Sequence, residues 1–484
     1  MKKRSFITVT DQFCGAGGSS IGATKAGAEL RLALNHWQLA IDTHNTNFPK
    51  ADHDCTDISA CDPRRYPSTD ILITSPECTN HTLAKGVARR RQSQLNMFGG
   101  VTDPAEERSR ATMWDVPRFA EYHQYRMIVV ENVIEARWWV MWDAWLHAMD
   151  LLGYAHQCVY LNSMHAHPTP QSRDRMYVVF WRKDGKRPDL TVTARAWCPR
   201  CEHDVQAVQA WKPGRSSGRY RKQYDYRCPD CRTVVEPYYY AAANAIDWSI
   251  PAQRIGDRTR PLREKTIQRI QAGLDRFGAQ PMVHPMKQDR DLRPVTEPLT
   301  TLVASASQHA LITPPPFLID MQYGDNRTYG IDAPLPTQTT RHSQALVMPF
   351  LTSYYGSGQN SSCDGPMPTV TTRDRHALVV PPFILSHYTR PAGQGAALSG
   401  IDLPMPTVPG RAVHSLVVPD DATPPAVDDC GFRMLAPAEC GAGMGFPSTY
   451  RVLGGSREQI KQYGNAVTPP AMELLMQRCM ESLR

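Results

Sequence analysis

Short β-rich runs alternate with segments of helical character over the first 181 residues of the chain. Strands are predicted at residues 6–13, 30–34, 71–74, 127–130 and 176–180. Strands that alternate with helices form a parallel sheet covered on both faces, because each helix carries the chain back to the start of the next strand. The pattern therefore predicts an α/β fold with a doubly wound sheet, in which ligands bind at the carboxyl ends of the strands.

Polar side chains stand at the ends of three of these predicted strands. Cys78 comes shortly after the strand at 71–74, Glu131 follows the strand at 127–130, and Arg173 and Arg175 precede the strand at 176–180. Taken singly, such residues are usually a buried thiol, a turn or a helix cap. A thiolate, a carboxylate and paired guanidiniums from successive strand ends instead predict an active site for nucleophilic catalysis on a nucleobase.

The length of 484 residues exceeds what one hydrophobic core usually supports, so two or three domains are expected. No apolar stretch is long enough to span a bilayer, and the polar start is followed by too short an apolar run for a signal peptide. We therefore expect a cytoplasmic protein without a membrane partner. The 13 cysteines are an odd number in a long chain, which favours reduced thiols over disulfides.

The positive charge of the chain is concentrated in one region. The net charge is +7, and residues 182–276 alone contain 20 Lys and Arg against 11 Asp and Glu. Such a region suits a phosphate backbone, although an ordinary solvated basic face would have the same composition.

Four cysteines in this basic region have the spacing of a metal site. Cys198 and Cys201 form one Cys-x-x-Cys pair, and Cys228 and Cys231 form a second. Two such pairs supply four thiolates for a tetrahedral Zn²⁺, and a site with four thiolates has no open position for a substrate. We therefore predict a structural zinc ribbon within a basic insert at 182–280, followed by an amphipathic helix over residues 261–274.

Residues 281–425 contain a diverged internal repeat. Four copies begin at Pro298, Pro334, Pro366 and Pro404, and each has a proline-led stretch, a Thr-rich polar turn and a short Val/Leu strand. The repeat predicts a scaffold of stacked β-units, whose equivalent polar turns could also contact successive nucleotides. Residues 426–484 again have the composition of a compact domain and end in a predicted amphipathic helix. This helix is expected to pack on the first domain (residues 1–181), which makes that domain discontinuous.

The order of these motifs resembles the DNA (cytosine-5)-methyltransferase family. The resemblance extends over about residues 5–181 and from about residue 431 to the end, and includes the Gly464–Asn465 turn. It implies a Rossmann-like fold that binds S-adenosylmethionine. The residues expected to line the cofactor site are Phe13, Gly15, Gly17, Gly18, His36, Trp37, Asp57, Ile58, Pro76, Asn465, Ala466 and Val467.

The resemblance also implies a role for each catalytic candidate. The Cys78 thiolate would add to C6 of a flipped cytosine, because C5 is a poor nucleophile until electron density is supplied to it. Glu131 would hold N3 and the exocyclic amine, while Arg173 and Arg175 would orient the base through O2 and fix Glu131. Residues 79–100 would form the loop that closes over the base.

Two positions depart from the family pattern. Glu77 stands directly before Cys78, where the family usually has Pro, and a neighbouring carboxylate tends to raise the pKa of a thiol. His36 stands where an acidic residue would bind the ribose hydroxyls. These departures leave open a modified donor or an RNA substrate.

Double-stranded DNA is the expected partner, and the middle of the chain takes the place of the family's target-recognition domain. A cognate restriction nuclease would be a second partner. We expect a monomer, because one active site and one bound duplex suffice for the reaction. From a different functional class, a DNA-binding module with a degenerate catalytic domain is the alternative, and retention of the four catalytic candidates in one chain counts against it.

Overall fold

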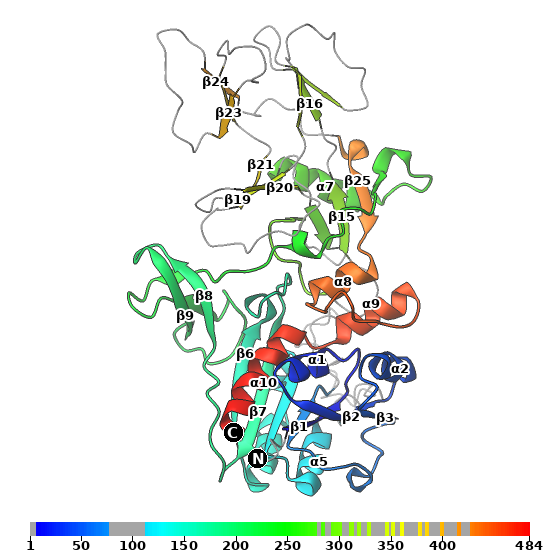
Figure 1. Cartoon of the computed structure of the whole chain (residues 1–484), viewed down its shortest axis with the longest axis vertical. Coiled ribbons are helices and arrows are strands. Elements are labelled where there is room, and N and C mark those ends of the chain that lie inside the picture. The colour runs from blue at the N-terminus through cyan, green and yellow to red at the C-terminus, as the bar shows by residue number, and fades with distance from the viewer. Residues whose placement is uncertain are drawn as a thin grey trace, which may run out of the picture. The chain divides into compact units, whose positions relative to one another are not determined.

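The computed structural model of the chain describes residues 6–76, 112–277, 282–285, 292–302, 309–313 and 426–484, together with short strands between 317 and 417 (Figure 1). The chain forms two compact units. The first comprises Met1–Ala245, Pro298–Ser307 and Ala436–Arg484, and the second comprises Ile246–Glu297 and Gln308–Leu435. Because residues 436–484 fold with the N-terminal residues, the first unit is discontinuous, as predicted.

A seven-stranded sheet with the order β3-β2-β1-β4-β5-β7-β6 forms the centre of the first unit. Its strands are β1 (Thr8–Gln12), β2 (Glu29–Asn35), β3 (Asp52–Cys55), β4 (Ile71–Thr74), β5 (Met127–Asn132), β6 (Tyr154–Asn162) and β7 (Asp174–Arg182). Neighbouring strands from β3 to β5 are parallel, and the order reverses beside β1, which pairs with both β2 and β4. The predicted strands are therefore confirmed, while β3 and β6 had not been predicted.

The expectation of a wholly parallel sheet is wrong for β7, which runs antiparallel to both β5 and β6. The connection from β6 to β7 contains only the 3₁₀ turn η5 (Ser163–His165) and a short loop. A parallel partner would need a crossover of a dozen or more residues, usually a helix, whereas a short connection joins antiparallel strands.

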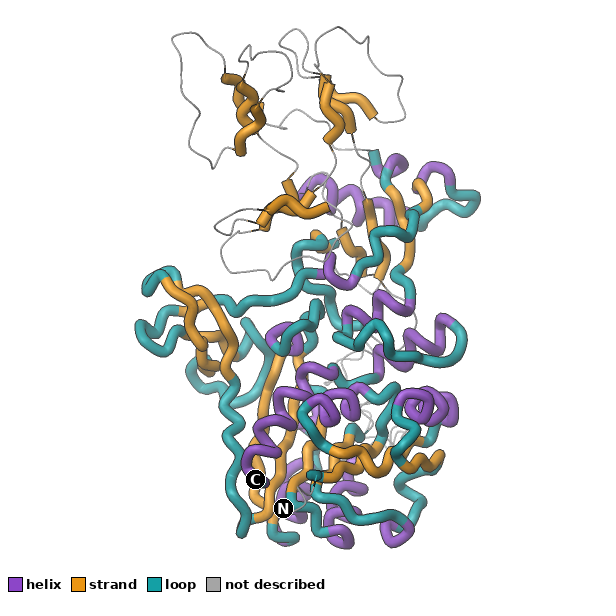
Figure 2. Tube along the Cα trace, viewed as in Figure 1, coloured by secondary structure: helices purple, strands orange, loops and turns teal. Residues whose placement is uncertain are grey.

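Helices cover both faces of this sheet (Figure 2). On one face, α5 (Asp115–His123) and α6 (Trp142–Leu151) contribute to a core that includes Phe119, Trp145, Ile128 and Val178. On the other face, α1 (Gly18–Lys25) and α10 (Pro469–Leu483) contribute to a second core. The other helical elements among the described residues of this unit are α2 (Gln38–Asn47), α8 (Pro437–Gly443), α9 (Ser456–Asn465), η1 (Pro63–Arg65), η3 (Thr112–Trp114), η4 (Ile134–Trp138) and η6 (Ala242–Ala245).

The closing helix packs on the N-terminal part of the chain, as expected. Met472 and Met476 of α10 belong to the same core as Ala23 of α1 and Val129 of β5. A Cβ atom added to Gly22 would lie 2.6 Å from the Pro469 carbonyl oxygen, so α1 and α10 can approach this closely only with glycine at that position.

Residues 193–235 form a separate small sheet with the order β11-β10-β9-β8, which we call the ribbon. Its strands are β8 (Thr193–Cys198), β9 (His203–Trp211), β10 (Tyr224–Arg227) and β11 (Val234–Val235). Buried ribbon residues such as Ala196, Tyr226 and Val235 belong to the same core as Met176 and Val178 of β7. The sequence had predicted that the ribbon belongs to a separate insert at residues 182–280. The ribbon instead lies within the first unit and shares its core.

The second unit contains a five-stranded sheet with the order β12-β25-β15-β13-β14 and the helix α7 (Glu264–Phe277), close to the predicted helix at 261–274. Its strands are β12 (Gln253–Arg254), β13 (Met282–Pro285), β14 (Arg293–Pro294), β15 (His309–Thr313) and β25 (Gly431–Met434). Two 3₁₀ turns, η7 (Ile255–Asp257) and η9 (Val427–Asp429), also belong to this unit.

Three antiparallel three-stranded sheets correspond to the sequence repeat, with the orders β17-β16-β18, β20-β19-β21 and β23-β22-β24. Their central strands are β16 (Phe317–Asp320), β19 (Phe350–Ser353) and β22 (Phe383–Ser386). Their outer strands are β17 (Arg327–Gly330), β18 (Gln344–Val347), β20 (Gln359–Ser362), β21 (His376–Val379), β23 (Ala397–Gly400) and β24 (His414–Val417). The first residue of each central strand, a Phe, pairs with the last Val of the third strand in all three sheets, so the last three of the four predicted copies repeat in register. The strand of the first copy is β15, which belongs to the five-stranded sheet.

The polar turns predicted to contact nucleotides lie outside the described residues. In the part of the chain that the structure describes, no helix combines the length and apolar character needed to cross a membrane.

Candidate active site

The carboxyl ends of β1, β4 and β5 lie side by side, since β4 pairs with β1 on one side and with β5 on the other. Glu131 lies within β5, one residue before its end. The sequence had predicted a strand that stops at residue 130, directly before Glu131. β7 runs in the opposite direction, so its first residues lie beside the end of β5. The sheet topology thus brings Glu131 and the two candidate arginines to one edge.

Glu131 and Arg175 form a close ion pair. The Arg175 Nε donates to Glu131 Oε1 at 2.9 Å, and the side chains are only 15% and 11% exposed, respectively. An ion pair so little exposed to solvent is weakly screened and fixes the direction of both side chains. The prediction that an arginine fixes Glu131 agrees with this geometry for Arg175.

Arg173 lies in a different environment, although the sequence had assigned both arginines to the base. Its guanidinium donates to the Leu302 carbonyl oxygen at 3.0 Å and to those of Gly464 and Ala466 at 3.3 and 3.2 Å. The predicted Gly464–Asn465 turn is instead the last part of α9, and the side chain joins the start of β7 to this end of α9 and to residues 298–302, which begin the first repeat. Its predicted contact with the base remains a prediction, and its observed contacts are those of a positioning residue.

Cys78 and Glu77 lie outside the described residues, as does the predicted loop at 79–100. Pro76 is the last described residue before them. It is buried, and its carbonyl oxygen accepts a hydrogen bond from Asn132 Nδ2 at 3.4 Å. The segment that leads to Cys78 in the sequence therefore leaves the sheet beside the end of β5.

In the glycine-rich turn after β1, every second residue has a left-handed backbone conformation. Phe13, Gly15 and Gly17 have φ values of +55°, +51° and +82°. Among the described residues, a Cβ atom on Gly15 would meet only the Phe13 carbonyl oxygen, at 3.9 Å, whereas one on Gly17 would clash with Tyr450 and one on Gly18 with Val467. Gly15 thus leaves space beside the turn, and Gly17 and Gly18 permit contact with the C-terminal segment.

The other predicted cofactor residues follow β2, β3 and α9. Trp37 caps the N-terminus of α2 and lies 4.4 Å from Lys461 Nζ, measured to the ring centroid, while His36 and Asp57 are exposed and Ile58 is buried. Ala466 caps the C-terminus of α9, next to the exposed Asn465. The structure brings the ends of β1 and α9 together, because Gly18 approaches the Val467 carbonyl oxygen.

Buried polar atoms at this edge fit a polar ligand. The side-chain amide of Gln12 and the hydroxyls of Thr74 and Ser75 are inaccessible to solvent and have no hydrogen-bond partner among the described residues. Gln12 and Thr74 pair in register at the ends of β1 and β4, where the strand order reverses. Unpaired buried polar groups are costly, so a bound molecule with polar groups would stabilise this edge.

A buried network below the glycine-rich turn was missed by sequence reasoning. Asp11 accepts hydrogen bonds from Ser19 and Ser20 at 2.5 and 2.6 Å, and His44 shares hydrogen bonds with Ser20 and His53 at 2.9 and 2.8 Å. Burial raises the pKa of Asp11 to about 6, against the effect of the serine hydroxyls, and lowers the pKa of His44 to about 3. Asp11, a charged residue inside the predicted strand at 6–13, was the signal in the sequence that could have revealed this network.

The turn that contains Asp57 and Ile58 is held by α5, which the sequence did not connect with the site. Arg118 donates to the carbonyl oxygens of Ile58 and Cys61 and pairs with Asp115, whose carboxylate also accepts from Ser59 at 2.7 Å. No sequence pattern at residue 118 distinguishes it from an ordinary surface arginine.

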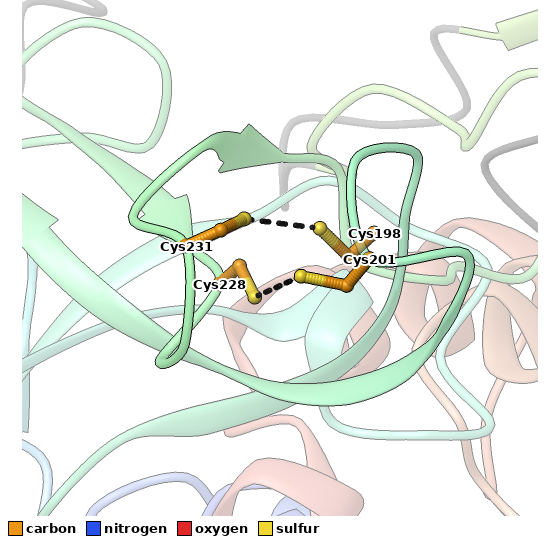
Figure 3. Close-up of side chains that lie close together, drawn as sticks. All are labelled: Cys198, Cys201, Cys228 and Cys231. Atoms are coloured by element: carbon orange, nitrogen blue, oxygen red, sulfur yellow. Dashed lines mark hydrogen bonds between the residues drawn. The ribbon is translucent and has the colours of Figure 1, made fainter.

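The four predicted metal ligands come together in the ribbon (Figure 3). The sulfur atoms of Cys198, Cys201, Cys228 and Cys231 all lie within 4.8 Å of one another, with 3.4 Å between Cys198 and Cys231 and 3.9 Å between Cys201 and Cys228. Four thiolates around a tetrahedral Zn²⁺ would be about 3.8 Å apart, from a Zn–S bond of about 2.3 Å. The donor set and its geometry therefore fit such an ion.

A family model for C-5 cytosine-specific DNA methylase matches residues 7–209 and 382–481. The Type II methyltransferase M.HgiDI of Herpetosiphon aurantiacus is 26% identical over 173 residues, which are 35% of this chain and 50% of that protein. M.HgiGI, a Type II methyltransferase of the same organism, is 28% identical over 131 residues, 26% of this chain and 90% of that protein. The matched segment thus spans about half the length of the first relative. A prophage-encoded DNA modification methyltransferase (E. coli) of known structure aligns over 99% of both chains, with a TM-score of 0.44 and 14% identity.

Proposed function

The chain belongs to the C-5 cytosine-specific DNA methylase family, and on that premise we propose that it methylates C5 of cytosine in double-stranded DNA. The observation that carries the proposal is the shielded Glu131–Arg175 pair at the end of β5. It lies beside the end of β4, from which the chain continues to Cys78. A carboxylate of fixed direction next to a nucleophile is the arrangement that this reaction needs.

In the proposed reaction, the Cys78 thiolate forms a bond to C6 of the flipped base, and the electrons of the C5–C6 double bond move to C5. S-adenosylmethionine, when bound, supplies an electrophilic methyl group for C5. Loss of the C5 proton to water and departure of the Cys78 sulfur restore the double bond. The target base must leave the duplex to meet these side chains.

Glu131 is proposed to bind N3 and the exocyclic amine of the base and so to favour the protonated adduct. A carboxylate has two oxygens, so pairing of Oε1 with Arg175 leaves acceptor capacity for the base. Arg175 would keep the carboxylate in that orientation and contact the base through O2.

S-adenosylmethionine is assigned to the edge formed by the glycine-rich turn, the ends of β2 and β3, and the Asn465–Val467 segment. Phe13 and Trp37 supply aromatic surface there, and Gly15 leaves the backbone accessible. The unpaired polar atoms of Gln12 and Thr74 lie at the same edge and support this assignment.

The ribbon is proposed to hold a structural zinc ion, and the ribbon and the repeated β-units are proposed to recognise DNA. Four thiolates close the coordination shell, so the ion would stabilise the fold and take no part in catalysis. Both relatives described above are Type II methyltransferases, which supports a cognate restriction nuclease as a further partner. A monomer suffices for the reaction.

Nucleoside mass spectrometry of unmethylated genomic DNA, incubated with the protein and S-adenosylmethionine, tests the proposal. We expect 5-methyldeoxycytidine with the wild type, none with Cys78→Ser, and a decrease of about 10²-fold or more in rate with Glu131→Gln. DNA binding without any Cys78-dependent product would contradict the proposal and favour a binding protein. A product on RNA alone, or only with a modified donor, would replace the substrate or donor assigned here.

A further inference from the structure

The ribbon contacts the catalytic edge through residues 212–223, the loop between β9 and β10. The backbone N–H of Tyr220 donates to Asp174 Oδ1 at 3.1 Å. Asp174 is the first residue of β7 and directly precedes Arg175, so the two side chains point to opposite faces of the strand. The loop therefore holds the start of β7 from the face opposite the Glu131–Arg175 pair.

A second contact from the same loop reaches the segment after β5. Arg219 forms an ion pair with Glu135, which lies in η4, four residues after Glu131. The Glu135 side chain is only 9% exposed and that of Arg219 is 37% exposed. A carboxylate so deeply buried needs a partner, so loss of the Arg219 guanidinium would force Glu135 and η4 to move toward solvent.

The loop itself is well braced, which allows it to position other residues. Gln223 accepts a hydrogen bond from the Arg219 N–H through Oε1 at 2.8 Å and donates its own N–H to the Arg219 carbonyl oxygen at 2.9 Å. The Tyr220 ring packs edge-on against His165, with 4.6 Å between ring centroids. Tyr220 is also part of the core shared by the ribbon and β7, so the loop is fixed to the sheet.

We propose that Arg219 and Tyr220 of the ribbon are positioning residues for the reaction proposed above. They hold the two segments that carry the ion pair: Tyr220 fixes the start of β7 beside Arg175, and Arg219 fixes η4 after Glu131. The ribbon thus has a function at the catalytic edge in addition to any contact with DNA. This inference rests on the proposed function for its effect on rate, but the contacts themselves do not depend on it.

The test compares two arginines of the same loop. Arg219→Ala removes the contact to Glu135, whereas Arg215→Ala removes an equal charge from an exposed position of the same loop. A change in DNA affinity caused by lost charge is therefore common to both variants. Steady-state kinetics on unmethylated genomic DNA separate kcat from KM. Hydrogen exchange of the peptides that contain residues 134–138 and 173–177 reports on η4 and on the start of β7 in the absence of turnover.

We expect Arg219→Ala to lower kcat at least tenfold more than Arg215→Ala does, since a displacement of about 1 Å in a catalytic constellation lowers rates by about 10²-fold. Faster exchange at residues 134–138, and at 173–177 as the loop loosens, should accompany this decrease, and Arg219→Lys, which keeps the charge, should recover part of the rate. Equal kcat values and equal exchange in the two alanine variants would overturn the proposal. If the wild type methylates nothing, the proposed function fails, and the exchange comparison still decides whether the loop positions β7.

Discussion

Gly22→Ala tests how closely the C-terminal helix packs on the first helix. The new Cβ would lie 2.6 Å from the Pro469 carbonyl oxygen and 2.7 Å from both Glu473 N and Met472 Cβ, and two of these three are backbone atoms that cannot rotate away. Overpacking of this kind costs up to about 3 kcal/mol. Alanine is favoured over glycine inside a helix by about 1 kcal/mol. The expected net effect is a loss of about 2 kcal/mol of unfolding free energy, from these two opposing contributions.

Urea unfolding followed by tryptophan fluorescence measures this difference, since Trp142 and Trp145 are buried in the core of the first unit. Thermal unfolding should show a decrease of roughly 3 °C in Tm, from an unfolding entropy of about 2.1 cal/mol/K per residue over the first unit. Lys25→Ala, at an exposed position on the same helix, is the matched control and should change stability by less than about 0.5 kcal/mol. Helix propensity alone predicts the opposite sign, so a Gly22→Ala protein as stable as the wild type, or more stable, would refute the close packing of α1 on α10.

Burial lowers the pKa of His44 from 6.5 to about 3 beside His53, so the unfolded chain binds more protons than the folded chain between these pH values and stability falls as the pH falls. His44→Gln should remove about 2 kcal/mol of the stability lost by the wild type between pH 7 and pH 5 in urea unfolding, and an unchanged loss would contradict the burial of a neutral His44. For the metal site, we expect about one zinc ion per wild-type chain and a large decrease in Cys231→Ser by elemental analysis; a metal-free wild type, with a ribbon unaffected by chelators, would contradict the site. Arg173→Lys places all its donors on one nitrogen, which cannot reach the carbonyl oxygens on both sides as the two guanidinium nitrogens do, so the KM for S-adenosylmethionine should rise about tenfold as the Ala466 segment loosens; a change in the KM for DNA alone would argue against this role.

Much of the fold and part of the site could be predicted because the relevant signals are local in sequence. An apolar β-branched run such as residues 127–130 forms a strand in almost any context, and a polar residue directly after it lies at the strand's end. The spacing of the four cysteines by itself indicates a single metal site. The repeat at 281–425 was visible as self-similarity, and the register of its β-sheets follows that period.

The sequence alone therefore determined the α/β class, the candidate catalytic residues and the cysteine cluster, since each depends on residue type and short spacing. The tertiary structure decided what depends on which distant segments meet. It placed β7 antiparallel, directed Arg175 to Glu131 but Arg173 to the backbone near Gly464, and joined the ribbon to the catalytic core. A local pattern specifies the conformation of its own segment, whereas the partner of a buried guanidinium is chosen by the packing of the whole unit.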